Sequence, residues 1–201
     1  MEYEQLPDID SDRIACQQIL AEDQSVYSIQ WVVLPAEAAA GLTAAGVLHL
    51  YLDYIERVTV GIIRVVTTDR AIEFRVAGTS LAILSFAQPE FAQLGGGEKG
   101  SLLISGGVLV QPKECDRGRL DFMVEPVVNG CRVALRLADY CPLILGSRRP
   151  ARWRRCLYRF TQAYLHKVIT IRFLEGLYAK FSGQRLKKGV VSIAVRKGVD
   201  T

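Results

Sequence analysis

Apolar and polar residues follow different periods along the first 56 residues, and the pattern predicts a helix, a strand and a second helical segment. Residues 10–22 have a partial apolar face and are expected to form a short helix, capped by Asp10 or Ser11. Residues 25–34 alternate apolar and polar side chains with a period of two, which is typical of a strand. In residues 35–56 apolar side chains recur every three or four positions, so one or two helices are expected there.

The middle of the chain has the pattern of an antiparallel meander. Short segments rich in β-branched residues alternate with gaps that are too short for a crossover connection, so neighbouring strands should run antiparallel. The exception is the glycine-rich stretch 88–100, which is expected to be a flexible loop. The six expected strands are 58–67, 70–77, 80–87, 101–111, 118–128 and 131–144.

Turn residues set the expected register of the last two of these strands. Asn129-Gly130 is the strongest short hairpin signal in the chain, because both positions of such a turn favour positive φ. As a two-residue turn it places Leu120 opposite Asp139, with apolar side chains on the same face. The opposite face holds charged residues, namely Asp121, Glu125, Arg132 and Arg136.

A Thr68-Asp69 turn gives the earlier hairpin the same division into faces. It places Val65 opposite Ile72, and it places Arg64 opposite Glu73 as a cross-strand ion pair. Both hairpins then have one apolar and one charged face. An antiparallel sheet of this kind needs a cover for its dry face and leaves its charged face in water.

The longest helical pattern lies near the C-terminus. Large apolar side chains recur every three or four residues from Pro150 to Ser182, which predicts one helix of about thirty residues, on the order of 45 Å long. This helix is the expected cover of the dry face. The remaining residues, 184–201, are basic and contain a candidate short strand at 190–195.

Composition places the chain among ordinary globular domains. It has 201 residues, of which 50% are hydrophobic and 23% charged, and this excludes a disordered chain. The net charge of +4 is unevenly distributed, since residues 1–24 carry seven acids and one base, whereas residues 145–201 carry fourteen bases and two acids. The acidic N-terminal segment and the basic C-terminal segment could attract each other, or each could face a partner.

The sequence gives no sign of export, of a membrane span or of a cofactor. The polar N-terminus lacks the features of a secretory signal, and we expect a cytoplasmic protein whose five cysteines are reduced. The glycines at 95–100 have the spacing of a dinucleotide fingerprint, but an expected strand follows them where a helix is required. The two histidines and five cysteines do not have the spacing of metal ligands, so neither a metal nor another cofactor is expected.

The order of the expected elements resembles the helix-grip fold of the START-like (SRPBCC) superfamily, of lipid-binding and polyketide cyclase/dehydrase type. The resemblance covers residues 25–182 and rests on the first strand running into Pro35-Ala36-Glu37, on the hairpin at 120–140 and on the helix after Pro150. It implies an α+β fold, in which a curved antiparallel sheet of about seven strands wraps around a long C-terminal helix. Residues 1–24 are then an acidic extension with a short helix, and residues 183–201 are a basic tail.

The resemblance also implies an apolar cavity between the sheet and the helix. Asp139 is the candidate for acid–base chemistry, since the expected register turns its carboxyl group toward that cavity. The alternative is that Asp139 lies in water at the rim of the sheet, or that Cys141-Pro142 disturbs the register. A dense arginine cluster is the candidate surface for an anionic partner and consists of Arg148, Arg149, Arg152, Arg155 and Arg159, with Arg154 beside them. The candidate ligand-binding residues are Ile63, Val65, Ile72, Phe74, Phe122, Val124, Leu135, Leu137, Trp153, Phe160 and Tyr164.

Three functions are compatible with this pattern. The first is binding of a hydrophobic small molecule or lipid, for transport or sequestration, and it is favoured over catalysis. The second is an enzyme of polyketide cyclase/dehydrase type that uses Asp139 or a tyrosine to move a proton in the same cavity. The third is a non-catalytic interaction protein whose basic surface meets an anionic partner such as a membrane. Nucleic acid is disfavoured because the aromatic residues near the arginines fall on the apolar stripe. The oligomeric state cannot be derived from the pattern.

Overall fold

The structure is a computed structural model that describes residues 6–23, 25–112, 116–145 and 164–200. Within these ranges the chain forms one eleven-stranded sheet, two α-helices and a short 3-10 helix. The helices are α1 (Ala44–Val58), α3 (Tyr164–Ser182) and the 3-10 helix η2 (Leu143–Leu145). The strands are β1 (Ile14–Leu20), β2 (Val26–Leu34), β3 (Ile63–Thr67), β4 (Ala71–Val76), β5 (Ala82–Ala87), β6 (Glu90–Leu94), β7 (Gly97–Gly106), β8 (Arg119–Val127), β9 (Gly130–Tyr140), β10 (Val190–Ser192) and β11 (Val199–Asp200).

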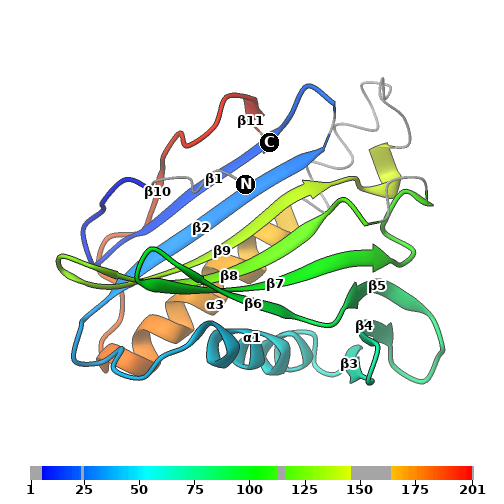
Figure 1. Ribbon diagram of the computed structural model, residues 1–201, viewed down its shortest axis with the longest axis horizontal. Helices are drawn as coiled ribbons and strands as arrows, with labels where there is room; N and C mark the ends of the chain where they lie inside the picture. The colour runs from blue at the N-terminus through cyan, green and yellow to red at the C-terminus, as the bar shows by residue number, and fades with distance from the viewer. Residues whose placement is uncertain (1–5, 24, 113–115, 146–163, 201) are drawn as a thin grey trace.

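The sheet is mixed. Its main path runs β10-β1-β2-β9-β8-β7-β5-β4-β3, while β11 pairs with β1 and β6 pairs with β7. β10 runs parallel to β1, and the other pairs along this path are antiparallel. Both α-helices lie on the same face of the sheet, with α3 packed against β1 and β2 and α1 against β3, β7 and β8 (Figure 1). We call this the inner face and the opposite one the outer face.

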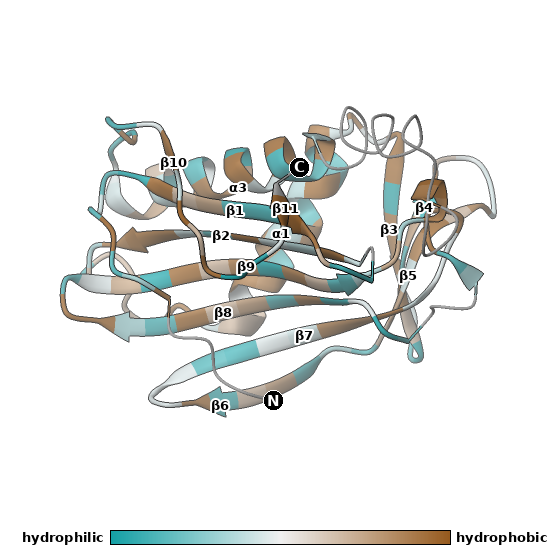
Figure 2. Cartoon of the chain, turned by 90° about the horizontal axis from the view of Figure 1, so that it is seen from above, coloured by the Kyte–Doolittle hydropathy of each residue, from teal (hydrophilic) through white to brown (hydrophobic). Residues whose placement is uncertain are grey.

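The sheet changes direction at β7. The first part of β7 pairs with β6 on one side and β8 on the other, whereas its last residues pair with β5. The register between β5 and β7 is irregular between Ser85 and Phe86. As a result β3, β4 and β5 stand at a steep angle to the long strands at one end of the molecule (Figure 2).

The expected seven-stranded antiparallel sheet around a long C-terminal helix is wrong. The described sheet has eleven strands and includes a parallel pair, because β1 from the N-terminal part pairs with β2, and β10 and β11 from the C-terminal part pair with β1. The C-terminal helix α3 is described over 19 residues, Tyr164–Ser182, and α1 covers the other part of the inner face. Residues 150–163 of the expected helix lie outside the described residues. Of the helices described, none is long and apolar enough to cross a membrane.

The helix expected at residues 10–22 is also wrong, since Ile14–Leu20 form strand β1. All seven residues of this strand are buried, because it is covered on both faces. A strand buried on both faces loses the alternation of apolar and polar residues, so its period is not visible in the sequence. The strand predicted at 25–34 is correct, and β2 spans Val26–Leu34.

The hairpin of β8 and β9 forms, but its register differs by two positions from the prediction. Val127 pairs with Gly130, so Leu120 opposes Leu137 and not Asp139. A shift of two positions leaves every side chain on its original face. The predicted division of these strands into two faces is therefore correct, although the predicted partners are wrong.

The hairpin of β3 and β4 is shifted in the same way. Arg64 opposes Arg75, and the expected ion pair between Arg64 and Glu73 is wrong. Glu73 instead binds Arg75 of its own strand. The two-residue turn lies one residue later than expected, at Asp69-Arg70, since the Thr68 N–H donates a hydrogen bond to the Ala71 carbonyl oxygen at 2.9 Å.

The flexible loop expected at 88–100 is a hairpin. β6 pairs with the start of β7, and Leu94 opposes Gly97 across a two-residue turn. The turn residues Gly95 and Gly96 both have positive φ, of 52° and 99°. Glycine adopts this conformation without a steric cost, and such turns match the twist of paired strands.

The outer face is not in water, contrary to the prediction. Asp121 lies opposite Arg136 and Glu125 lies opposite Arg132, and all four side chains are buried. Arg136 Nη2 is 2.6 Å from Asp121 Oδ2, and Arg132 Nη1 is 3.5 Å from Glu125 Oε2. Arg132 also binds Asp8 of the N-terminal segment at 2.7 Å. The charged residues are therefore buried as pairs.

Segments from both ends of the chain cover the outer face. Ile9, Ile193 and Val195 pack against a second hydrophobic cluster that contains the fully buried Trp31. The acidic and basic segments also contact each other directly, since Lys188 Nζ lies 3.5 Å from Asp10 Oδ2 and 3.4 Å from a carboxylate oxygen of Asp12. Of the two alternatives that the charge pattern left open, mutual attraction is present at these residues.

Candidate functional site

An apolar cavity lies on the inner face, at the end where β3, β4 and β5 turn away from the long strands. Its volume is about 190 Å³, and we call it the inner cavity. Side chains from α1, α3 and strands β3, β4, β5, β7, β8 and β9 surround it. The lining residues are Tyr51, Ile55, Thr59, Ile63, Phe74, Ile83, Leu84, Phe86, Ile104, Leu109, Leu120, Leu137, Tyr140, Leu165, His166 and Ile169.

Helix α1 forms one wall of the inner cavity. The Thr43 hydroxyl begins the helix by accepting a hydrogen bond from the Gly46 N–H at 3.0 Å. Tyr51, Ile55 and Thr59 follow at intervals of four, so their side chains lie along one face of the helix and its C-cap. The helix expected within 35–56 is therefore present, and it starts after the turn that follows Pro35.

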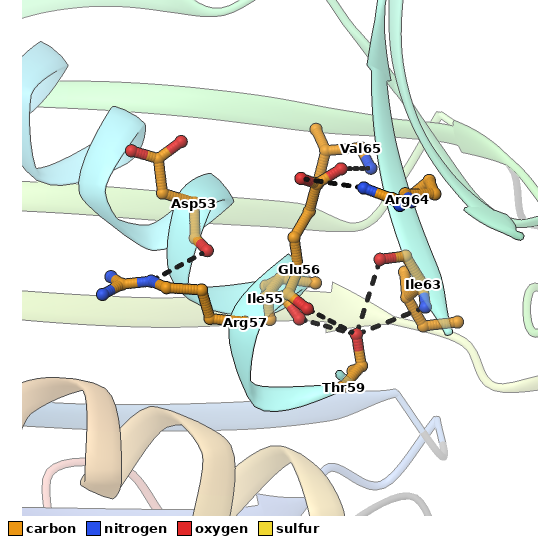
Figure 3. A network of polar contacts seen from close by, with 8 residues as sticks. All are labelled: Asp53, Ile55, Glu56, Arg57, Thr59, Ile63, Arg64 and Val65. Atoms are coloured by element: carbon orange, nitrogen blue, oxygen red, sulfur yellow. Dashed lines mark hydrogen bonds and ion pairs between the residues drawn. The ribbon is translucent and has the colours of Figure 1, made fainter. Parts of the chain in front are cut away.

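Hydrogen bonds fix the end of α1 to strand β3 (Figure 3). The Thr59 hydroxyl donates to the Ile55 carbonyl oxygen at 2.8 Å and accepts from the Ile63 N–H at 3.2 Å. Two positions further along β3, the Val65 N–H donates to Glu56 Oε1 at 2.8 Å. These contacts satisfy N–H groups on the edge of the sheet. They also hold the mouth of the cavity in a defined position.

Aromatic rings form the wall between the inner cavity and the rest of the core. The Tyr51 ring packs edge-on against Phe122 and Phe173, with centroids 5.3 Å and 5.2 Å apart. On the opposite wall Phe74 and Phe86 pack in the same way, with centroids 5.2 Å apart. Such pairs have preferred geometries, so they resist collapse into the cavity better than flexible side chains do.

Among the described residues, few polar groups reach the inner cavity, and none that lines it carries a charge at neutral pH. Burial raises the pKa values of Tyr51 and Tyr140 above the usual range of a phenol. The Tyr140 hydroxyl donates to the Leu109 carbonyl oxygen at 2.8 Å. Burial lowers the pKa of His166 to about 4, so its imidazole is neutral at pH 7.

His166 is the polar lining residue with the greatest freedom to meet a ligand. Its side chain is half-buried at the start of α3. Among the described residues no hydrogen-bond partner is found for its ring nitrogens, whereas the Tyr140 and Thr59 hydroxyl groups already bind backbone oxygens. A neutral imidazole has one donor and one acceptor nitrogen. An apolar ligand with a single polar group could therefore be oriented by this side chain.

Asp139 does not line the inner cavity. It follows the last regular pair of β9 at a bulge, where the register between β2 and β9 changes, and its φ is +56°. The extra residue turns Tyr140 toward the cavity in its place. The register that placed Asp139 opposite Leu120 is wrong, because the turn of the hairpin lies one residue earlier than expected.

The structure divides the predicted ligand-binding residues into four groups. Ile63, Phe74 and Leu137 line the inner cavity, and their contact with a ligand stays a prediction. Tyr164 is exposed. Outside the described residues lie Trp153, Phe160 and the arginine cluster Arg148, Arg149, Arg152, Arg155 and Arg159. The other predicted residues pack elsewhere in or against the hydrophobic core, namely Val65, Ile72, Phe122, Val124 and Leu135.

The sequence pattern missed the contribution of α1, β5 and β7 to the cavity. Tyr51 and Ile55 were visible as part of an apolar helix face, but that face had no assigned role. Phe86 and Ile104 belong to strands whose angle to the rest of the sheet depends on the irregular pairing at β7. His166 was considered only as a metal ligand, and no group of three potential ligands is found within the described ranges.

Comparisons with known proteins do not assign the chain to a family. No family model matches it, and no curated protein matches it. A crystal structure of CalU16 from Micromonospora echinospora is similar to this chain with a TM-score of 0.36 and 11% identity, over 84% of each chain. Membership of the START-like superfamily therefore stays a prediction.

Proposed function

We propose that the protein binds a small apolar molecule in the inner cavity and acts as a carrier or a sequestering protein. The observation that carries this proposal is a cavity of about 190 Å³ that opens to the surface at Leu165 and whose described lining residues are mostly apolar. Protein interiors are close-packed, and an apolar hollow of this size costs stability unless a ligand fills it. An engineered apolar cavity of roughly 150 Å³ in another protein binds benzene, so a cavity of this size can hold one small ring.

The volume limits the size of the ligand. Sites for drug-sized molecules measure about 300–1,000 Å³, so the inner cavity suits a single small ring system or a short alkyl chain rather than a whole lipid. The neutral His166 imidazole adds one polar contact. We therefore propose a weakly polar ligand with one hydrogen-bonding group, and indole is a suitable probe.

Enzymatic use of the same cavity is a weaker alternative. Asp139, the residue proposed for proton transfer, is not among the lining residues. The raised pKa values of Tyr51 and Tyr140 make their phenols poor acids at neutral pH. His166 could accept a proton only weakly, because its pKa is about 4. Binding therefore has more support than acid–base catalysis.

Calorimetric titration with indole tests the proposal. We expect one indole per chain with a Kd between about 10 µM and 1 mM, or roughly −7 to −4 kcal/mol. Leu84→Trp places a larger side chain in the cavity wall and should weaken binding at least tenfold. Leu94→Trp is the matched control, since Leu94 is another half-buried leucine of the sheet but lies outside the cavity.

Two outcomes would contradict the proposal. One is a folded wild-type protein that does not bind indole or benzene at millimolar concentration. The other is equal weakening by the two tryptophan variants, which would place the ligand outside the inner cavity. Unfolding curves of both variants establish that each is folded before titration.

A further inference from the structure

Large apolar side chains are exposed around the inner cavity. Their exposed fractions range from 44% to 88%. Scattered exposed apolar residues are ordinary, but a contiguous group commonly marks an interaction surface. We call this group the apolar rim, and it consists of Val60, Ile62, Leu81, Val108, Leu143 and Leu165.

Backbone hydrogen bonds show that the segments carrying the apolar rim are neighbours. The Ala77 N–H donates to the Ile62 carbonyl oxygen at 2.8 Å, and the Val76 N–H donates to that of Leu81 at 3.0 Å. Two further hydrogen bonds connect the segments of Val108 and Leu143 to these. The Val108 N–H donates to the Ala82 carbonyl oxygen at 3.1 Å, and the Leu143 N–H donates to that of Leu109 at 2.8 Å.

The apolar rim adjoins the mouth of the inner cavity. Thr59 and Ile63 line the cavity on either side of the exposed segment that carries Val60 and Ile62. In the same way, Leu109 lines the cavity beside the exposed Val108. Leu165 belongs to both, since it lines the cavity and is largely exposed. Apolar surface is therefore continuous from the cavity to the outside of the protein.

Charged residues are absent from the segments that form the rim. Residues 58–62, 77–83, 105–111, 141–145 and 164–166 contain no Asp, Glu, Lys or Arg. Arg57, Arg64 and Lys167 stand within two residues of these segments, and so do the acids Glu56 and Asp139. Glu56 accepts a hydrogen bond from the Val65 N–H and lies 3.9 Å from Arg64. The rim is thus an uncharged surface whose border includes three cations.

Val60, one of the rim residues, is held in an unfavourable backbone conformation. Its φ is +51°, a region that β-branched residues rarely adopt, and 88% of the residue is exposed. The hydrogen bonds of Thr59, drawn in Figure 3, fix this segment in its form. The Gly61 N–H also donates a hydrogen bond to the Glu56 carbonyl oxygen at 2.8 Å. The fold gains no burial from this side chain, and such strain is typical of functional sites.

We infer that the apolar rim docks on the surface of an anionic lipid bilayer. The uncharged segments enter the interface, and the bordering Arg57, Arg64 and Lys167 meet acidic headgroups. A bilayer fits better than a protein partner because the segments that form the rim carry no charged residue, while cations stand at their border. Docking would also place the mouth of the inner cavity against the apolar layer, where an apolar ligand concentrates.

Flotation with lipid vesicles tests the docking. One set of vesicles contains phosphatidylcholine alone. The other contains in addition about 30 mol% phosphatidylserine, to give the negative surface of an anionic leaflet. Wild-type protein should float with the anionic vesicles and much less with the neutral ones. Val60→Asn with Ile62→Asn should lower the bound fraction at least tenfold, because asparagine tolerates positive φ and is polar.

Val128→Asn is the matched control. Val128 is 96% exposed at the turn between β8 and β9. That turn lies at the opposite end of the long strands, about 30 Å from the rim at the usual rise per residue. This variant should float like the wild type. Arg57→Gln should leave the protein folded and reduce its preference for anionic over neutral vesicles.

The result that would overturn the inference is a lack of flotation of the wild-type protein, or equal loss in the Val128 variant. A second copy of the chain is the competing occupant. If light scattering shows a dimer that Val60→Asn with Ile62→Asn breaks, the rim is an interface between copies and the inference is wrong. Membrane docking does not depend on the proposed ligand binding. A double variant that no longer floats but still binds indole like the wild type would show that the two properties are separate.

Discussion

The two faces of the sheet are built from alternating residues of the same strands, yet they differ in how they are filled. On the outer face, β8 and β9 place Asp121 opposite Arg136, and the two charges neutralise each other in a packed layer. On the inner face, Leu120 and Leu137 stand opposite each other and border a hollow of about 190 Å³. Because paired charges and a hydrophobic cluster pack the outer face, the sheet is supported from that side even where the inner face is not completely filled.

Breaking the outer face should have the largest effect on stability. Arg136→Met leaves Asp121 buried without its cation and should lower the free energy of unfolding by about 3–5 kcal/mol. Adding Asp121→Leu removes the orphaned charge and should recover most of that loss. Urea unfolding of the single and double variants measures both values. A double variant no more stable than the single one would show that the pair itself, and not the unpaired charge, is decisive.

The inner face should respond to pH through His166. The pKa of His166 is about 4 in the folded protein and about 6.5 when unfolded, so the unfolded chain binds a proton first as the pH falls. Stability should therefore decrease between pH 6.5 and pH 4, by about 1–3 kcal/mol for this partly buried group. His166→Gln should flatten this part of the profile. Denaturant unfolding at several pH values, compared between the two proteins, measures the difference.

The hydrogen bonds at the mouth of the inner cavity should make the next largest contribution to the free energy of unfolding. Thr59→Val keeps the shape of the side chain but leaves the Ile63 N–H without its acceptor, and it should cost about 1–3 kcal/mol. Amide exchange at Ile63 should become faster. Thr67→Val, at an exposed position of β3, is the control and should change thermal stability little. Equal effects of the two variants would mean that the network is not specific to the cavity mouth.

The smallest expected effect is a gain in stability. Val60→Asn relieves a β-branched residue at positive φ and should stabilise the protein by up to about 1 kcal/mol. Val128→Asn makes the same change in a turn and should be close to neutral. Thermal unfolding measures both. A destabilised Val60 variant would indicate that the exposed side chain is part of the core packing after all.

The sequence predicts the faces of the strands better than their partners or their number. Because the side-chain period is two, a register error of two positions still placed Phe74 and Leu137 on the cavity side. The helix predicted at 10–22 is a strand because burial on both faces removes the alternation that marks a strand. The bend at β7 and the bulge at Asp139 depend on pairing between distant segments, which a local pattern does not contain.

A crystal structure of the protein with indole is the most direct test of ligand binding in the inner cavity. We expect density for one indole there, between Tyr51, Phe86 and Leu137, within hydrogen-bond distance of His166. Crystals of Leu84→Trp grown and soaked in the same way should lack that density. Indole bound on the outer face, or a cavity that has collapsed or contains ordered water in the presence of saturating indole, would contradict the account.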